Sequence, residues 1–324
     1  MKEGVIGKLP DLWKETYDIV AQVPLGKLTT YGAVAEALGD IIASRFVGLA
    51  MSRNDDIVRV PCRRVVQSDG KIGGYTGGGP EKKIRLLRGE GIEISGSRIV
   101  GLERYMFRDF ETSHPLRTLR KKQMLLKKHL SLNPIRSIPS RVAGIDVAYS
   151  NDHAYAAMVT FDYESGDELD RVVVEGDAKF PYVPSYLAFR EIPVIAPLLR
   201  HVARSTIVMC DGNGILHPEG FGIASQVGVV FGLPSVGVAK KLLCGKVART
   251  PNVRISEVRV GRRVVGHALQ GQRCVNPVYV SAGHGLSPKQ ARMIASRFLK
   301  HRVPEPTRVA HIVAEAARKG TSHK

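Results

Sequence analysis

The sequence predicts two domains, a mainly helical one followed by a mixed α/β one. At the usual ~100–200 residues per domain, its 324 residues make about two domains, each long enough to bury its own core. The first hundred residues combine short helical patterns with a glycine-rich stretch, whereas β-branched runs begin at Arg141 and then alternate with helical patterns. We therefore expect domains at 1–105 and 106–324.

Two short helices joined by a tight turn are expected in the first domain. A helical pattern covers 11–20, and the run 29–39 begins with threonine, the usual N-cap, and ends with glycine. A further helix over about 42–52 follows almost directly. Such a pair is the skeleton of a helix-turn-helix, whose second helix lies in a DNA groove. Helical hairpins are common in other proteins too, so the pattern alone is weak.

The second domain is expected to be a mixed sheet flanked by helices. We interpret the basic segment 106–140 as its opening helix rather than as a linker. The expected strands are 142–149, 156–163, 171–175, 206–210 and 235–238, and the expected helices are 186–203 and 222–230.

The charge favours a polyanionic partner. The formal net charge is +18, and residues 106–140 carry eight basic and two acidic side chains. Each phosphate that a basic side chain neutralises releases condensed counterions, which favours nucleic acid as the partner. A solvated basic surface is the alternative explanation.

The sequence also bears on location. No run approaches the ~18 apolar residues of a membrane span, so no membrane partner is expected. The start of the chain lacks the apolar core of a signal peptide. Cys62, Cys210, Cys244 and Cys274 are too scattered for a disulfide framework. We therefore expect a reducing, cytoplasmic environment.

Cys62 lies in a heptapeptide that favours reactivity. Pro61 fixes the local turn, and the adjacent Arg63 and Arg64 favour a thiolate over a thiol. A thiolate is the nucleophilic form of cysteine, so covalent chemistry is one interpretation. The other is a structural, buried thiol that packs as a small apolar side chain.

Residues 8–95 resemble the C-terminal domain of the O6-alkylguanine-DNA alkyltransferases, a DNA-binding winged helix-turn-helix that holds the active site. The shared motifs are Val23–Gly32, Ser44–Gly48, Arg53-Asn54, Val60–Val66, Gly73–Tyr75 and Leu86–Gly91. The resemblance implies that Cys62 accepts the alkyl group. It also implies the following roles: Tyr31 at the guanine edge, Arg45 in the space left by a flipped nucleotide, Asn54 as a hinge, and Glu90 behind the active site.

This chemistry suits the residue types. A thiolate can attack the alkyl carbon on guanine O6, and a tyrosine hydroxyl can donate to the guanine as negative charge develops. The base must leave the stack to be reached. One departure from the family matters, because Arg63 stands where histidine usually links the thiol to the glutamate. Transfer is the favoured reading, and an alkyl-lesion sensor that performs no chemistry is the alternative.

Three carboxylates in the second half point to a divalent cation. Asp146 lies inside an apolar strand, where a carboxylate is costly unless paired or metal-bound. Asp211 follows another apolar strand, and Glu191 lies on the expected helix between them. On neighbouring elements they would hold Mg²⁺ or Mn²⁺ through oxygen. Each alone could equally be a capping or turn residue.

Residues 115–300 resemble endonuclease V, a metal-dependent nuclease with an RNase H-like fold that acts at deaminated bases. The shared motifs are Gly144–Asp146, Phe180–Glu191, Asp211–Gly214, His217-Pro218, Phe221–Ser225, Gly237–Lys241 and Val280–His284. The resemblance implies these roles: Asp146, Glu191 and Asp211 as metal ligands, His284 as a catalytic partner, Tyr182 on a wedge beside the lesion, His217 and Lys240 lining the site, and Gly212 and Gly214 allowing close backbone approach.

Together the resemblances imply a DNA-repair protein of the alkyltransferase–endonuclease V fusion type. It would act as a methylated-DNA–cysteine S-methyltransferase and as a deoxyribonuclease V that needs Mg²⁺ or Mn²⁺. The nuclease would nick the second phosphodiester 3′ to hypoxanthine. The expected partner is double-stranded DNA with alkylated or deaminated bases, bound by a monomer. Two alternatives stay open: a lesion sensor that recruits the nuclease, and a nuclease that acts on single-stranded DNA or on inosine in RNA.

Overall fold

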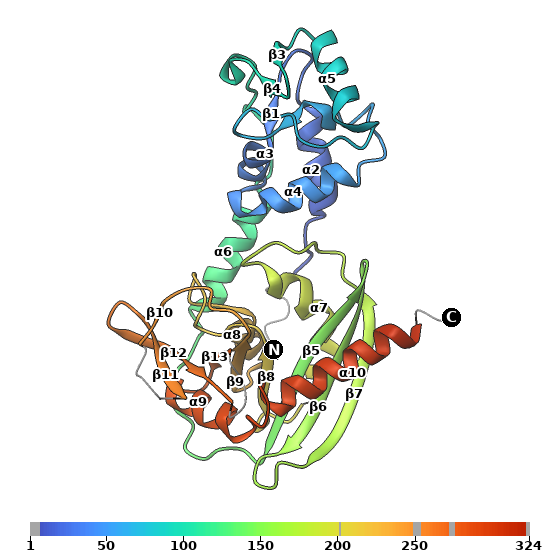
Figure 1. Cartoon of the computed structure of the whole chain (residues 1–324). Coiled ribbons are helices and arrows are strands. Elements are labelled where there is room, and N and C mark those ends of the chain that lie inside the picture. The colour runs from blue at the N-terminus through green and yellow to red at the C-terminus, as the bar shows by residue number, and fades with distance from the viewer. Residues whose placement is uncertain (1–6, 201, 249–253, 272–275, 322–324) are drawn as a thin grey trace. The chain divides into compact units, whose positions relative to one another are not determined.

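The computed structural model describes residues 7–200, 202–248, 254–271 and 276–321 (Figure 1). They form two compact units. The N-terminal unit comprises 8–121 with the short segment 180–184, and the C-terminal unit comprises the other described residues. No helix in these ranges is long and apolar enough to cross a membrane.

The N-terminal unit extends past the boundary expected at residue 105 because the following segment is bonded to it. The Thr112 hydroxyl donates to the carbonyl of Ala37 at 2.9 Å. Arg120 forms an ion pair with Asp40 at 3.0 Å. These polar contacts bind residues 106–121 to the helices of the first unit.

The N-terminal unit is mainly helical, as the sequence predicts. Its helices and strands are α2 (Leu12–Ala21), β1 (Thr29–Thr30), α3 (Tyr31–Leu38), η1 (Ile41–Ala43), α4 (Ser44–Ser52), η2 (Cys62–Arg64), β2 (Val65–Val66), α5 (Gly79–Gly89), β3 (Ile94–Ser95), β4 (Arg98–Ile99) and η3 (Leu102–Arg104). Helix α6 (Pro115–Lys127) carries the chain into the second unit. A helix is present within 106–140 as expected, but it covers only 115–127, and its residues up to Lys121 belong to the N-terminal unit.

The helical pair of the first unit is confirmed with its caps. The Thr30 side chain accepts from the backbone N–H of Ala33 and so caps α3. Gly39 ends this helix at a φ of 107°, a left-handed conformation that favours glycine. The short turn η1 then leads directly into α4. This is the predicted helix-turn-helix.

The C-terminal unit contains a mixed sheet. In its described residues the order is β10-β11-β12-β13-β9-β8-β5-β6-β7. The bounds are β5 (Arg141–Ser150), β6 (His153–Asp162), β7 (Glu168–Asp177), β8 (Ile207–Asp211), β9 (Ser235–Ala239), β10 (Lys246–Val247), β11 (Ile255–Val260), β12 (Arg263–Leu269) and β13 (Val278–His284). Strands β5, β8 and β9 are parallel to one another, and their outer neighbours run antiparallel.

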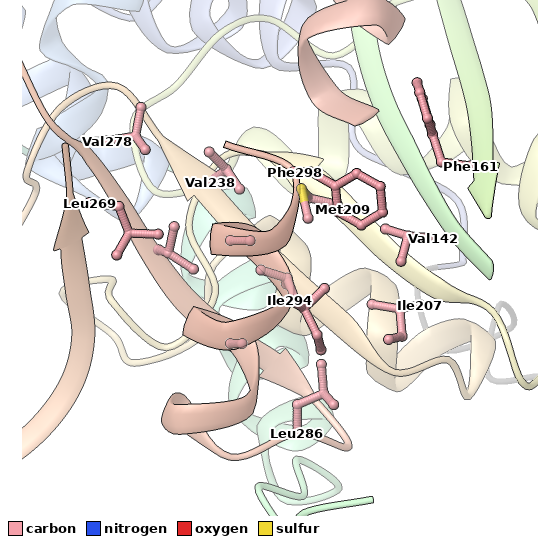
Figure 2. Close-up of a cluster of buried hydrophobic side chains, with 14 of the residues drawn as sticks. Val142, Phe161, Ile207, Met209, Val238, Leu269, Val278, Leu286, Ile294 and Phe298 are labelled. Carbon is pink, nitrogen blue, oxygen red and sulfur yellow. The ribbon is translucent and has the colours of Figure 1, made fainter. Parts of the chain in front are cut away.

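Four helices accompany the sheet in the described residues. They are α7 (Leu187–Leu199), α8 (Ile223–Phe231), α9 (Pro288–Arg297) and α10 (Glu305–Thr321). Side chains of α9 and of the segment after it, such as Ile294 and Phe298, pack with Val142, Ile207 and Met209 of the sheet (Figure 2). The apolar face of the sheet is buried in this way.

Helix α10 lies directly on strand β5. A Cβ atom at Gly144 of β5 would run into the backbone of Pro306 and Thr307 at the start of α10. Only glycine lets the two backbones approach this closely. The position of α10 along β5 is therefore fixed at Gly144.

We predict that Gly144→Ala destabilises the C-terminal unit, because the added methyl group forces α10 away from β5. Overpacking of this kind costs about 1–3 kcal/mol. Gly176→Ala in β7 is the matched control, since nothing lies within 4 Å of a Cβ built there. Calorimetric unfolding should show a lower melting temperature for Gly144→Ala only. Equal melting temperatures for the two variants would contradict the prediction.

Candidate functional site

Cys62 begins a tight turn that presents its sulfur to a cavity. The thiol follows Pro61 and opens the 3₁₀ turn η2. The side-chain amide of Asn54 donates to the carbonyl of Val60 at 3.0 Å, and the backbone N–H of Cys62 donates to the same carbonyl at 2.7 Å. Asn54 therefore holds the backbone that enters the turn, which agrees with the hinge role expected for it.

The cavity beside Cys62 has a volume of about 390 Å³ and is lined by Tyr31, Met51, Ser52, Cys62, Gly74 and Tyr75, among others. The structure thus brings together two of the residues that the sequence singled out. Burial raises the pKa of Tyr31, and a negative charge on Cys62 raises it further. The Tyr31 hydroxyl therefore keeps its proton at neutral pH and can act as a hydrogen-bond donor.

Helix α4 forms one wall of this cavity. Gly48, Met51 and Ser52 line it. Arg45 lies three residues before Gly48 and is exposed. Residues three apart share a helix face, so Arg45 lies on the side of α4 that borders the cavity.

Glu90 is held by two guanidinium groups. Arg63 Nε donates to Glu90 Oε1 at 2.6 Å, and Arg64 Nε donates to Glu90 Oε2 at 2.7 Å. Burial would raise the pKa of Glu90, but the hydrogen bonds and charges of Arg64 and Arg63 outweigh it and lower the pKa. Arg63 is therefore bound to the carboxylate, and both oxygens of Glu90 accept from arginine.

Lys83 is a feature of this site that the sequence analysis missed. Its side chain is fully buried, and Nζ donates to the carbonyl of Val65 at 2.6 Å and, at 3.3 Å, to that of Gly74 in the cavity lining. Helical spacing in the sequence could have indicated that Lys83 is buried, because it lies four residues before the apolar Leu87 and therefore on the same face of the helix.

Strand register brings Asp146 and Asp211 together. Strands β5 and β8 are parallel, and Ile145 pairs with Cys210. The next residues along the two strands are Asp146 and Asp211, so the aspartates are at the same level of the sheet. The negative charge of Asp211 raises the pKa of Asp146, because the two carboxylates repel each other.

Glu191 of α7 belongs to the same cluster. Burial raises the pKa of Asp146 to about 6, with a further contribution from Asp211. Burial also raises the pKa of Glu191 to about 8, and the charges of Asp146 and Asp211 contribute to this shift. The three carboxylates that the sequence singled out are therefore close enough to repel one another. We call Asp146, Glu191 and Asp211 the carboxylate cluster.

Each acid of the carboxylate cluster has a polar neighbour. Lys240 Nζ lies 2.6 Å from Asp211 Oδ2. The Tyr149 hydroxyl donates to Glu191 Oε1 at 3.2 Å. These contacts confirm that Lys240 borders the cluster.

His311 of α10 is a neighbour of the carboxylate cluster that the sequence analysis did not single out. Its Nδ1 lies 2.6 Å from Asp146 Oδ2. The close approach of α10 to Gly144 of β5 sets this contact, because it fixes α10 against the strand that carries Asp146. The signal in the sequence was a histidine in an amphipathic helix, which is by itself uninformative.

The resemblance implies that His284 is a catalytic partner near the scissile phosphate, and the strand register places it away from the carboxylate cluster. His284 pairs with Ser235, which pairs with Val208, whereas Asp211 pairs with Val238. His284 is thus three strand positions from the level of Asp211, about 10 Å at ~3.3 Å per residue. Its Nδ1 accepts a hydrogen bond from the backbone N–H of Ser131. Because β13 runs antiparallel to β9, its last residue, His284, lies beside the start of β9, whereas Asp211 lies at the end of β8.

The other expected residues occupy distinct settings. A Cβ at Gly212 would meet Ile223, and one at Gly214 would meet the backbone of Ala282, so both glycines permit close approach to the protein itself. His217 is buried, and its Nδ1 accepts from the backbone N–H of Glu219. Tyr182 is 62% exposed, as a side chain that inserts into a partner must be.

The carboxylate cluster fits a hard divalent cation by its chemistry. Carboxylate oxygens are the ligands that Mg²⁺ and Mn²⁺ prefer, and a cation would remove the repulsion that raises the pKa values of Asp146 and Glu191. In the described ranges, no three His, Cys, Asp or Glu side chains are arranged as a ready-made metal site. Lys240 contacts Asp211 Oδ2, and His311 contacts Asp146 Oδ2.

Two family models match the chain. Residues 124–312 match endonuclease V. Residues 11–92 match the DNA-binding domain of 6-O-methylguanine DNA methyltransferase. The two matches fall on opposite sides of the change from the N-terminal to the C-terminal unit after residue 121.

Similar proteins cover nearly the whole chain. A bifunctional methyltransferase/endonuclease of Picrophilus torridus is 36% identical over 93% of this chain and 95% of its own length. One of Thermoplasma volcanium is 37% identical over 89% and 84%. Among solved structures, the endonuclease V of Streptomyces avermitilis is 35% identical, with a TM-score of 0.59 over 63% of this chain and 93% of its own.

A further solved structure contains nucleic acid. It is the endonuclease V of Ciona intestinalis in complex with a 24mer DNA that contains an inosine followed by a ribo-adenosine. It is 25% identical to this chain, with a TM-score of 0.58 over 64% of this chain and 98% of its own.

We predict that Glu90→Gln destabilises the N-terminal unit by about 3 kcal/mol at neutral pH, because it leaves two largely buried guanidinium groups without their carboxylate. The pKa of Glu90 is lowered by folding. Its contribution is therefore present above the unfolded pKa of about 4.3 and is lost as the pH falls through the folded value.

Urea unfolding from pH 7 to pH 3 checks this prediction. The difference between wild type and Glu90→Gln should shrink as the pH falls. Glu93→Gln is the matched control, because the exposed Glu93 has no ion pair among the described residues. A pH-independent difference would contradict the prediction.

Proposed function

We propose that this chain, which belongs to the family of bifunctional methyltransferase/endonucleases, repairs two kinds of damaged base in DNA. Its second half belongs to the endonuclease V family. Alkyl transfer is assigned to the N-terminal unit and strand cleavage to the C-terminal unit. The formal net charge of +18 suits a DNA partner.

Cys62 would accept the alkyl group from O6-alkylguanine. The thiolate attacks the alkyl carbon, the carbon–sulfur bond forms, and the bond to guanine O6 breaks with its electron pair left on the guanine. The Tyr31 hydroxyl would donate to the guanine as this charge develops. The shared cavity of Cys62 and Tyr31 supports the assignment, since its 390 Å³ is within the ~300–1,000 Å³ of small-molecule pockets. The thioether product is stable, so each molecule reacts once.

The carboxylate cluster would hold Mg²⁺, with Mn²⁺ as a substitute, for cleavage beside a deaminated base. The ion would activate water and offset charge at the phosphate. Lys240 and His311 would orient Asp211 and Asp146 toward it. The exposed Tyr182 would insert beside the lesion, and the second phosphodiester 3′ to hypoxanthine would be cut. The observation that carries this half is the register that sets Asp146 beside Asp211.

We predict that the chain nicks a duplex containing one inosine in the presence of Mg²⁺. Asp146→Ala should abolish nicking, because it removes a proposed ion ligand. Gel analysis of a labelled strand gives both the rate and the position of the cut. An intact wild-type reaction would contradict the proposal, and preferred cleavage of a competing inosine RNA would favour the RNA alternative.

A pair of histidine variants sharpens this test. His311→Ala should slow nicking at least ~10-fold, because it removes the imidazole that lies 2.6 Å from Asp146 Oδ2 and holds this carboxylate in place. His284→Ala should retain the wild-type dependence on Mg²⁺ concentration, because His284 is at the other end of the strand pair. The reverse result would restore the role first expected for His284.

We predict transfer of a radiolabelled methyl group from O6-methylguanine DNA to Cys62. Cys62→Ala should abolish labelling, and Cys244→Ala should leave it unchanged, because Cys244 is outside the cavity. Digestion and mass spectrometry identify the labelled residue. Methylated wild type with the label elsewhere would contradict the assignment.

A lesion sensor is the second candidate for the N-terminal unit. The observation in its favour is that Arg63 is bound to Glu90, so no histidine relay connects the glutamate to the thiol. Tight binding to alkylated DNA with an unlabelled Cys62 is the result that this candidate requires.

A further inference from the structure

We propose that the Lys83 ammonium is the counter-ion of the Cys62 thiolate, and that it does the work for which the family uses histidine. This inference rests on the proposed alkyl transfer and assigns a positioning residue to it. Lys83 acts on the sulfur by its charge and leaves the alkyl group and the guanine untouched. Three observations lead to this conclusion.

The first observation is that Lys83 is buried without a carboxylate. Its side chain is 0% exposed, and its hydrogen bonds go to the carbonyls of Val65 and Gly74. Among the ion pairs of the described residues, none involves Lys83. An ammonium taken out of water is costly unless an anion accompanies it. A nearby anion would therefore stabilise the ammonium form of Lys83.

The second observation is that both acceptors of Lys83 belong to the surroundings of the thiol. Val65 follows the turn that Cys62 opens, and Gly74 lines the same cavity as Cys62. Burial lowers the pKa of Lys83 to about 8, and the negative charge of Cys62 opposes this effect. The lysine thus stays mainly protonated at neutral pH, and a negative charge on Cys62 favours its ammonium form.

The third observation is that the other groups around Cys62 do not supply a comparable charge. Arg63 and Arg64 bind Glu90. Tyr17 of α2, Tyr31 of α3 and Tyr75 of the glycine-rich loop all feel the charge of Cys62, and burial raises the pKa of each, so they stay neutral. They can stabilise the sulfur as dipoles, whereas Lys83 brings a full charge without a competing carboxylate.

The order of events follows from these charges. In the resting protein the thiolate and the ammonium offset one another. Attack on the alkyl carbon makes the sulfur a neutral thioether, and the negative charge moves to the guanine. Lys83 then loses its counter-ion. The Lys83 ammonium therefore stabilises the thiolate before the reaction and has no such role once the thioether has formed.

Lys83→Gln in the full-length chain tests the proposal. Glutamine keeps a donor for the carbonyl of Val65 and removes the charge. Reaction of Cys62 with iodoacetamide is followed by peptide mass spectrometry between pH 6 and pH 10. We expect the rate at pH 7 to fall about 10-fold, as for a shift of one pH unit, and to approach that of wild type at high pH.

Lys82→Gln is the matched control, since it makes the same change of charge at the exposed neighbour on α5. Its profile should coincide with that of wild type. If the profile of Lys83→Gln also coincides with wild type, the proposal is wrong. A rate that falls equally at every pH would show a structural role and would also overturn it.

The reciprocal measurement needs no change at Lys83. In Cys62→Ser the lysine loses its counter-ion, so its titration, followed by the ¹³Cε shift in NMR, should move to lower pH than in wild type. An unchanged midpoint would overturn the proposal even if Lys83→Gln failed to fold. Both measurements avoid DNA, so a protein that shows both shifts but no methyl transfer would contradict the proposed function and leave this inference standing.

Discussion

The crowding of like charges in the carboxylate cluster is the constraint on which the C-terminal unit depends. Asp146, Glu191 and Asp211 come from two strands and a helix, and each of the first two has a raised pKa because burial and neighbouring acids disfavour its charge. Protonation of an acid or a nearby cation relieves this repulsion. Lys240 and His311 give part of that relief, and a divalent ion would supply the rest.

The site around Cys62 also contains a buried charge that the protein offsets only partly, but here the charge is positive. Here a cation, Lys83, is buried where the fold offers only carbonyl oxygens. The carboxylate that could have paired with it, Glu90, is already held by Arg63 and Arg64. The two units thus each leave a charge incompletely offset at the place proposed for chemistry. Active sites commonly contain ionisable groups whose charge is only partly offset by the protein, and such groups often have shifted pKa values.

Local patterns predicted what depends on nearby residues. The cap at Thr30, the left-handed Gly39 and the strands that carry Asp146 and Asp211 are all visible in short windows of sequence. The strands and helices after residue 239 were not predicted. The separation of His284 from the carboxylate cluster was not visible in the sequence, because a motif does not reveal at which end of its neighbours an antiparallel strand finishes. His311 and Lys83 escaped notice because their roles arise from packing between distant segments.

The replacement of histidine by Arg63 has a consequence for how the two activities can be combined. An arginine keeps its proton under all ordinary conditions, so it cannot relay one from the thiol. A reaction that happens once per molecule needs no repeated proton transfer from the thiol, because the thiolate can be present before the substrate binds. The proposed hydrolytic site must instead act repeatedly, and His311 contacts Asp146 in it at 2.6 Å. In the proposed function, a site that reacts once can therefore do without a histidine relay, and Glu90 is free to pair with Arg63 and Arg64 instead.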